Sequence, residues 1–292
     1  MKADHYTIVM TKLAYLGPDG TFCSEAARRY KGEREGTLVD YDTIFDVMNA
    51  VIEHKADIGV VPLENSVEGS VTTTVDVFLQ DNDLKIMQEI DLPIEHCLLA
   101  PPGVKIKDIT DVLSHMQALA QCREFLRQRM PSVNHVPAKS TADAARRVAG
   151  VGPVIYDGQK HVFAAIGNKL TAKMYGLEIL CESVQDSDAN VTRFAVIGYE
   201  QLPPTGHDRT SIVFAAHRDR PGSLYEALGE FARRQINLSK IVSRPSKKVL
   251  GDYYFLVDLE GHPSDPKVAE AIAAIQEKSA FFKLLGAYPK YL

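Results

Sequence analysis

Residues 58–71 read IGVVPLENSVEGSV. An apolar run with the length of a buried strand ends here in polar side chains, and the amphipathic stretch VTTTVDVFL follows. Polar residues at the carboxyl end of a strand stand where α/β sheets usually bind ligands. We therefore expect Asn65 and Ser66 to donate hydrogen bonds to a carboxylate or hydroxyl, and Glu68 to be a solvated surface charge. A turn of the Asx type that caps a helix is the alternative interpretation.

On both sides of this segment, short apolar runs alternate with amphipathic stretches. The runs LAYLG, KIMQEIDL, IEHCLLA and FAVIG predict strands, whereas TFCSEAARRY, IFDVMNAVIEHK, QALAQCREFLRQR, STADAARRVA and NKLTAKMYG predict helices. This order is typical of an α/β fold. The turn GPDGTF has two glycines where a dinucleotide-binding loop needs three, so we expect no dinucleotide cofactor.

A polar, proline-containing stretch at residues 201–209 lacks periodicity and predicts a linker. Beyond it, residues 210–292 read as strand, helix, strand, strand, helix and strand, the ferredoxin-like βαββαβ order. Two helices on one face leave the other face or an edge of that sheet to be covered, which favours dimerisation through this unit. We therefore expect one unit at residues 1–200 and another at residues 210–292.

The composition excludes several function classes. The 292 residues are enough for more than one domain, and 45% hydrophobic and 24% charged side chains are ordinary for a soluble protein. No apolar run approaches the roughly 20 residues of a membrane span. The N-terminus lacks the pattern of a secretory signal, so we expect a cytoplasmic protein without a membrane partner. A net charge of -5 without a basic run gives no footprint for nucleic acid. The four cysteines form no CxxC pair, so we expect neither a metal site nor a disulfide framework.

Two segments that join a strand to a helix could bind a ligand. In GPDGTFCS, residues 17–24, a helix that starts near Thr21 would point free N–H groups at an anion, and a tight turn with an N-cap hydroxyl is the alternative. In SHMQALAQ, residues 114–121, Gln117 and Gln121 share a helix face. A lone histidine such as His115 is more often a structural residue than an acid–base catalyst.

The segment NVTRF, residues 190–194, places a hydroxyl beside a permanent cation. Such a pair could bind an oxygen and a carboxylate together. A threonine at a strand edge with a surface arginine is the alternative. A nucleophilic pair of Cys23 and His115 has no local signature in the sequence.

Together and in this order, the segments resemble the prephenate dehydratase family over nearly the whole chain from Leu13 onward. YLGPDGTF, PLENSVEGSV, the SHxQALAQC pattern, STADAA, AKMYGL and NVTRF recur with family-like spacing. The resemblance is to monofunctional members that carry a C-terminal ACT domain. It implies two α/β lobes similar to type II periplasmic binding proteins, the second at roughly residues 93–175, with the active site between them. The ACT domain, residues 210–292, is expected to bind phenylalanine as a feedback inhibitor.

Four positions depart from the family pattern. Cys23 stands where Ser or Thr is usual and is a poorer hydrogen-bond donor. Met116 replaces a proline, which should loosen that turn. In the ACT domain, Ser223 replaces an alanine, and Val242 replaces the glutamate of the ESRP motif. We expect Val242 to affect the strength of phenylalanine regulation.

The resemblance also implies a reaction and a set of site residues. Prephenate loses its ring carboxylate as CO2 and its ring hydroxyl as water, and gives phenylpyruvate without cofactor or metal in L-phenylalanine biosynthesis. Thr192 is expected to donate to the departing hydroxyl, assisted through Glu64 or His115 because an alcohol is a weak acid. The expected catalytic residues are Thr192, Asn65, Ser114 and Gln121, and the expected substrate-binding residues are Thr21, Glu64, Ser66, Gly69, His115, Arg193 and Phe194. Of these, Thr21 and Arg193 would hold carboxylates. The expected phenylalanine ligands are Gly222, Ser223, Leu224, Asn237, Ser243 and Arg244.

Several alternatives remain open at the level of sequence. Arogenate dehydratase performs the same chemistry on the amino analogue of prephenate, and the motifs do not separate the two. A non-catalytic solute-binding protein or phenylalanine sensor would belong to a different class. The expected assembly is a homodimer or homotetramer.

Overall fold

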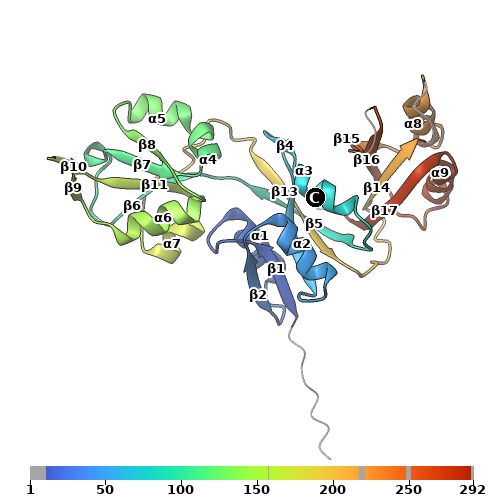
Figure 1. The fold of residues 1–292 in the computed structure, drawn as a ribbon, viewed down its shortest axis with the longest axis horizontal. Coiled ribbons are helices and arrows are strands. Elements are labelled where there is room, and N and C mark those ends of the chain that lie inside the picture. The colour runs from blue at the N-terminus through green and yellow to red at the C-terminus, as the bar shows by residue number, and fades with distance from the viewer. Residues whose placement is uncertain (1–10, 157, 217–220, 248–250, 291–292) are drawn as a thin grey trace, which may run out of the picture.

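A computed structural model describes residues 11–156, 158–216, 221–247 and 251–290. The first ten residues, which form most of the N-terminal stretch without a secretory-signal pattern, lie outside this range. Figure 1 shows two α/β lobes and a C-terminal unit side by side, with the first lobe between the other two. In the described part of the chain, no helix has the length and apolar character needed to cross a membrane.

The first lobe is a sheet with helices packed on it. Its strand order is β2-β1-β3-β13-β5, and the short β4 pairs with β3. The strands are β1 (Lys12–Leu16), β2 (Thr37–Tyr41), β3 (Ile58–Asn65), β4 (Gly69–Ser70), β5 (Lys85–Pro93) and β13 (Val191–Gly198). The helices are α1 (Phe22–Lys31), α2 (Ile44–Ile52) and α3 (Thr72–Phe78). The predicted strand at residue 58 and the helix after it are confirmed.

The second lobe has a five-stranded sheet in the order β12-β6-β11-β7-β8 and a separate hairpin. The strands are β6 (Cys97–Ala100), β7 (Asp111–Ser114), β8 (Asn134–Pro137), β11 (Phe163–Gly167) and β12 (Glu178–Cys181), and the hairpin is β9 (Val154–Tyr156) with β10 (Gln159–His161). The helices are η1 (Ile106–Asp108), α4 (Met116–Gln121), α5 (Arg123–Arg129), α6 (Thr141–Gly150) and α7 (Lys169–Tyr175). Because β12 completes this sheet, the lobe extends beyond the predicted boundary at residue 175. The single helix expected at residues 117–129 is interrupted at Cys122.

The two sheets share one topology. In each, three strands run parallel, and one antiparallel strand separates them from the last strand. That antiparallel strand is the one that enters the lobe directly after the chain has crossed from the other: β13 in the first lobe and β6 in the second. The predicted two-lobed, type II periplasmic-binding-protein-like arrangement is confirmed, with two crossings that join the lobes.

The C-terminal unit is a ferredoxin-like βαββαβ domain, as predicted. Its antiparallel sheet has the order β15-β16-β14-β17. The elements are β14 (Asp208–Ala216), α8 (Ser223–Arg233), β15 (Leu238–Pro245), β16 (Tyr253–Glu260), α9 (Pro266–Glu277) and β17 (Ser279–Pro289). The first strand begins at Asp208, so the linker is shorter than residues 201–209.

The face of this sheet that its helices leave open packs on the first lobe. Val213, Leu256 and Leu285 belong to the same buried cluster as Ile86 of β5. At Gly286 (φ +150) a Cβ would lie 2.2 Å from the carbonyl oxygen of Ile86, so glycine is required where β17 crosses β5. The prediction that a second subunit could cover this face is therefore wrong, because the first lobe covers it. The predicted contact through a sheet edge is left to the edge strand β15.

Candidate active site between the two lobes

A cleft of about 560 Å³ lies between the lobes, and both contribute to its walls. Strand ends and helix N-termini supply most of the polar lining, because sequence positions that follow a strand lie at the same edge of an α/β sheet. The polar side chains on the wall come from Thr21, Cys23, Asp42, Asn65, Glu68, Ser70, His96, His115, Gln117, Gln121, Lys139, Ser140, Thr141 and Thr192. Phe194 and Gly69, two of the predicted substrate-binding residues, also line the cleft.

Asn65 and Thr192 form the centre of the first lobe's wall. They are directly paired on β3 and β13, and Asn65 Nδ2 donates to Thr192 Oγ1 at 2.8 Å. Asn65 Oδ1 accepts from the backbone N–H groups of Val67 and Glu68 at 2.9 and 3.0 Å. An Asx turn is therefore present and fixes the amide of Asn65, but it does not cap a helix as the alternative interpretation predicted, because the N-cap of α3 is Val71. Since Thr192 Oγ1 accepts from this amide, its own proton is free to be donated elsewhere.

Two side chains that the sequence did not single out join this pair to the second lobe. Asn190 accepts from Asn65 Nδ2 at 2.7 Å and donates to Gln121 Oε1 at 3.0 Å. His96 Nε2 lies 3.3 Å from the same Gln121 oxygen. Asn190 and His96 are both 3% exposed. Glu68, expected to be a solvated charge, is exposed but lines the cleft, and Gln121 Nε2 donates to it at 3.4 Å.

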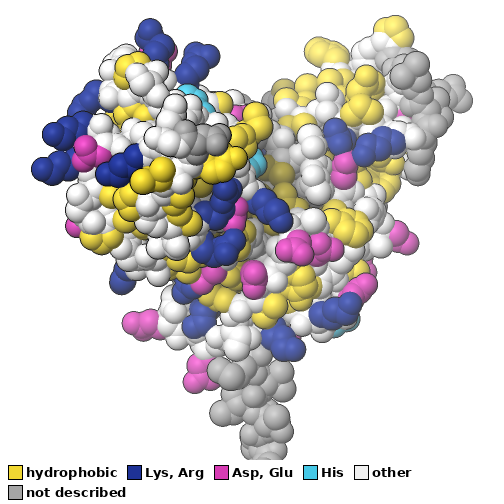
Figure 2. Space-filling view, turned by 60° about the vertical axis from the view of Figure 1, so that its left-hand side comes forward, with side chains coloured by type: hydrophobic (Ala, Val, Ile, Leu, Met, Phe, Trp, Pro, Cys, Tyr) yellow, Lys and Arg dark blue, Asp and Glu magenta, His cyan; other side chains and the backbone are white. Residues whose placement is uncertain are grey.

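Two helix N-termini open into the cleft, one from each lobe. Thr21 caps α1 by accepting from the N–H of Ser24, and Ser140 caps α6 by accepting from the N–H of Asp143. The remaining first-turn N–H groups and the helix dipole favour an anion. Lys139, directly before the α6 cap, is the only lysine or arginine among the described residues that line the cleft. In Figure 2, further Lys and Arg side chains gather on the surface of the second lobe.

Ser114, Ser66 and His115 have structural partners. Ser114 is fully buried, donates to the carbonyl oxygen of Ile166 at 2.8 Å and is not part of the cleft wall. Ser66 donates to the carbonyl oxygen of Ala189, and is not part of the wall either. His115 lines the cleft and caps α4 through Nδ1. His115 thus remains on the cleft wall, whereas the predicted roles of Ser114 and Ser66 at the substrate are corrected, because both hydroxyl groups donate to backbone carbonyl oxygens outside the wall.

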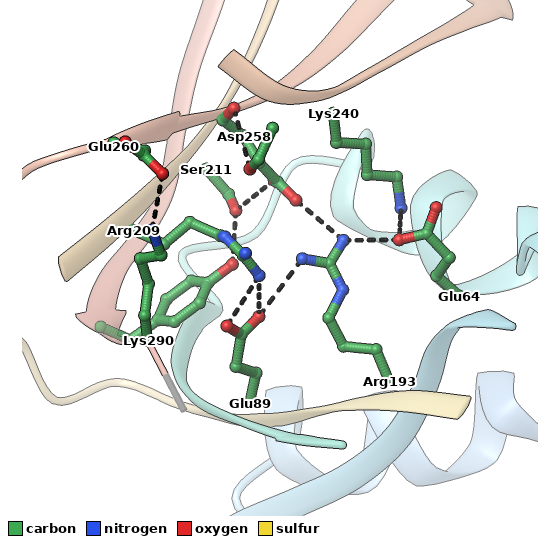
Figure 3. A network of polar contacts seen from close by, with 11 residues as sticks. Glu64, Glu89, Arg193, Arg209, Ser211, Lys240, Asp258, Glu260 and Lys290 are labelled. Carbon is green, nitrogen blue, oxygen red and sulfur yellow. Dashed lines mark hydrogen bonds and ion pairs between the residues drawn. The ribbon is translucent and has the colours of Figure 1, made fainter. Parts of the chain in front are cut away.

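Arg193 and Glu64 lie on the side of the sheet away from the cleft. Successive side chains of a strand point to opposite faces, so if Thr192 and Asn65 face the cleft, their neighbours on β13 and β3 face away. In Figure 3, Arg193 extends toward the ACT-like unit and donates to Glu64 and to Asp258 of β16, both at 2.8 Å. The prediction that Arg193 and Glu64 contact the substrate is corrected: in this structure they join the two units.

The cluster around Arg193 balances its charges. Three cations, Arg193, Arg209 and Lys240, pair with three carboxylates, Glu64, Glu89 and Asp258. Burial alone would lower the pKa of Arg193, but the neighbouring carboxylates, Asp258 foremost, raise it above its ordinary value. Burial, followed by the nearby Arg193, lowers the pKa of Lys240. We call these six residues the interdomain ion cluster.

The comparisons with known proteins agree with this geometry. The family model for prephenate dehydratase matches residues 13–202, and the ACT domain model matches residues 210–277. The chain belongs to the prephenate dehydratase family. A prephenate dehydratase of Methanocaldococcus jannaschii is 40% identical over 282 residues, which are 95% of this chain and 97% of that protein.

Two solved structures are also similar to this member of the prephenate dehydratase family, each over 96% of its length. The first is the prephenate dehydratase from Arthrobacter aurescens in complex with L-Phe, with a TM-score of 0.86, 36% identity and 90% of that chain covered. The second is GqqA, described as a novel type of quorum quenching acylase, with a TM-score of 0.82, 30% identity and 98% of that chain covered.

The predicted phenylalanine ligands of the ACT domain lie on two elements. Gly222 (φ +89) is the N-cap of α8, and Ser223 and Leu224 begin that helix. Ser243 and Arg244 lie on the edge strand β15, and Asn237 directly precedes it. The guanidinium of Arg244 donates to both oxygens of Asp76, on α3 of the first lobe, at 2.6 and 2.7 Å. Arg244 is thus bound to the catalytic region in this structure.

The structure argues against a cysteine nucleophile in the cleft. Burial raises the pKa of Cys23 to about 12, so its thiol is protonated at neutral pH. His115 Nδ1 accepts from the backbone of Gln117. A thiol in this state is a weak nucleophile, and the Cys23 position contributes shape to the cleft rather than reactivity.

Proposed function

We propose that the cleft converts prephenate to phenylpyruvate, CO2 and water. The observation that carries this proposal is the Asn65 to Thr192 hydrogen bond, which leaves one hydroxyl proton available on the cleft wall. The departing ring oxygen of prephenate needs such a donor. The chain's membership in the prephenate dehydratase family supports the same reaction.

The chemistry requires a donor and two anion sites. When the ring carboxylate leaves as CO2, its bonding electrons form the last double bond of the aromatic ring, and the C–O bond to the hydroxyl breaks. The oxygen leaves as water after it has received one proton. Thr192 stabilises the negative charge on that oxygen by donating its O–H. Glu68 is an exposed carboxyl group on the wall, and it could pass a proton between solvent and the cleft.

The two carboxylates of prephenate would bind at the two helix N-termini. The α1 terminus at Thr21 lies in the first lobe, and the α6 terminus at Ser140, with Lys139 beside it, lies in the second. A dianionic ligand that engages both termini would hold the lobes together. This assignment replaces Arg193 as the expected carboxylate ligand with Lys139 and the α6 terminus.

The function is tested by phenylpyruvate formation from prephenate. Thr192→Ala should lower kcat by about 10² to 10⁴, the usual loss when a positioned proton donor is removed. Thr192→Ser keeps the hydroxyl and is the matched control, expected to retain most of the activity. Circular dichroism checks that each variant is folded. An alanine variant with nearly unchanged turnover would sink the assignment of Thr192, and a wild-type protein preferring arogenate would make it an arogenate dehydratase.

We further propose that L-phenylalanine inhibits through the ACT domain. The Arthrobacter aurescens relative was solved with L-Phe, and the ACT domain here contacts the catalytic region at several places. Two of them are the interdomain ion cluster and the helix α3, where Asp76 pairs with Arg244 and Lys283 donates to the carbonyl oxygen of Phe78. The N-terminal end of α3 follows Val71 on the cleft wall, so a shift of this helix would reach the substrate.

The edge strand β15 is the proposed contact between subunits. Its residues alternate between partly exposed and exposed, and Ile241 is 47% exposed. An unpaired edge with an apolar side chain favours pairing with another chain, which supports a homodimer through the ACT domain. All four cysteines are free, which fits a reducing compartment and supports a cytoplasmic location. Sedimentation equilibrium would measure the assembly.

An acylase activity like that of GqqA is the second candidate. It would need a nucleophile, and the elevated pKa of Cys23 argues against the thiol on the cleft wall. Release of carboxylic acid from N-acyl substrates, measured beside phenylpyruvate formation, separates the two activities.

A further inference from the structure

The amide of Asn65 can have only one orientation. Its Oδ1 receives two backbone N–H groups, which can only donate, so the Nδ2 group must face Thr192 Oγ1 and Asn190 Oδ1. If the amide were reversed, its oxygen would accept the proton of Thr192. The hydroxyl would then have no proton left for the departing oxygen of the substrate.

The orientation of Asn65 determines that of every side chain beyond it. Asn190 receives a proton on Oδ1, so its Nδ2 must face Gln121 Oε1. The same Gln121 oxygen faces His96 Nε2, so the histidine carries its proton on Nε2 and donates it. Gln121 then presents its Nε2 group to Glu68. Donors and acceptors match at each step from Thr192 to His96.

We propose that Asn190 and His96 are positioning residues: Asn190 holds the Nδ2 group of Asn65 as a second acceptor beside Thr192, and His96 holds the amide of Gln121, so that together they keep the Thr192 proton directed to the cleft. This inference rests on the proposed function. Both residues are buried, and the Nδ1 atom of His96 has no hydrogen-bond partner in the structure. Burial also lowers the pKa of His96, which keeps the ring in the neutral form that the chain requires.

The two positioning residues sit on the two crossings between the lobes. His96 follows β5 on the first crossing, and its backbone is held by Val184 N–H and by the side chain of Gln185 at 2.9 Å each. Asn190 ends the second crossing, and its carbonyl oxygen accepts from the N–H of Ile94 at 2.8 Å. The catalytic amides are therefore aligned by the same segments that set how the lobes stand to one another.

The His96 step is tested by two substitutions that differ in where they place an N–H group. His96→Gln can put its amide nitrogen near the position of Nε2 and should restore the donor. His96→Asn places its nitrogen near Nδ1 and should not. We expect kcat for prephenate to fall by roughly 10²-fold in His96→Asn, the scale of a small misplacement of catalytic groups, and to stay within about tenfold of wild type in His96→Gln. KM should change little in either.

The Asn190 step is tested by a double-mutant cycle with Gln121. If both belong to one chain, Asn190→Ala and Gln121→Ala should lose less together than the product of their separate losses in kcat. Asn168→Ala combined with Gln121→Ala is the matched control. Asn168 is another buried asparagine that joins the lobes, through Glu25 at 3.1 Å, and its effect should multiply independently.

The outcomes are separable from those of the proposed function. A wild-type protein that forms no phenylpyruvate would overturn the function, whatever the variants do. With an active wild type, equal kcat values for His96→Gln and His96→Asn, or independent effects of Asn190 and Gln121, would overturn the positioning role. Melting temperatures of all variants identify losses that come from unfolding.

Discussion

Replacing Arg193 by methionine would leave the interdomain ion cluster with one excess negative charge. The wild-type cluster pairs three cations with three carboxylates. The side chains of Arg193, Glu89 and Asp258 are 10%, 2% and 1% exposed, so water cannot replace the lost cation. Removing one partner of such a buried group typically costs about 3–5 kcal/mol. At a urea slope of about 3 kcal/mol per molar, the unfolding midpoint should fall by about 1–2 M.

A second substitution that restores the charge balance should recover part of this loss. Asp258→Asn in the Arg193→Met background leaves two cations and two carboxylates, and we expect the double variant to be more stable than Arg193→Met alone. Arg127→Met is the control, because Arg127 pairs with Glu124 on the surface and their side chains are 69% and 43% exposed. Its effect should stay within about 0.5 kcal/mol.

The loss should also depend on pH in a defined direction. Burial raises the pKa of Glu89, with Arg209 and Arg193 opposing the rise, so without Arg193 its pKa should rise further. A carboxyl group with a raised folded-state pKa binds its proton more tightly in the native state, so its contribution to stability is lost as pH increases. The defect of Arg193→Met should therefore shrink as the pH falls from 7 toward the unfolded carboxyl pKa.

Urea unfolding followed by circular dichroism at pH 7 and pH 5 measures all three expectations. A loss below about 1 kcal/mol for Arg193→Met would refute the view that the cluster is buried and charge-balanced. A double variant no more stable than Arg193→Met would refute the charge argument specifically.

Three further predictions use other parts of the structure. Because its pKa is raised to about 12, Cys23 should resist iodoacetamide at pH 8 in the folded protein and react after denaturation, as mass spectrometry would show; fast labelling of the native protein would contradict this. Asp76→Asn should release Arg244 and strengthen L-phenylalanine binding by at least about fivefold in calorimetric titration if Arg244 must leave Asp76 to bind it, whereas weaker binding would exclude that exchange. Gly59→Ala should destabilise the first lobe by about 1–3 kcal/mol, because the added Cβ would lie 2.9 Å from Ile197 Cγ1, while Gly150→Ala, with open space at its Cβ, should be neutral or stabilising in thermal melts.

The sequence predicted those parts of the site that lie at the ends of regular elements. Asn65 follows an apolar run, and Thr21 precedes an amphipathic helix, so local patterns placed both at the ligand-binding edge of a sheet. The motifs predict that Arg193 and Glu64 contact the substrate, since they stand next to Thr192 and Asn65 in the sequence. The alternation of side chains along a strand already implied the opposite face, and it is the signal that would have corrected them.

Other parts of the site depend on contacts that no local pattern contains. Asn190 and His96 lie on the crossings between the lobes, where neither helical nor strand periodicity applies. Their partners, Asn65 and Gln121, are 125 and 25 residues away in the sequence. The STADAA segment matches a family motif, but the position of Lys139 and Ser140 on the cleft wall depends on how the two lobes face each other.

The strand β13 has a consequence for how this chain reaches its native state. It lies between β3 and β5 in the first sheet, yet the whole second lobe separates β5, which ends at Pro93, from β13, which begins at Val191. During synthesis from the N-terminus, the sheet of the first lobe therefore lacks the strand between β3 and β5 until β13 has been made. The second lobe can complete its own sheet before that. Contacts between such distant segments form slowly, and the waiting edges are open to aggregation. Since β13 carries Thr192, the step that completes the first lobe's sheet also brings the proposed catalytic hydroxyl to the cleft wall, and a chain that ends before β13 lacks it.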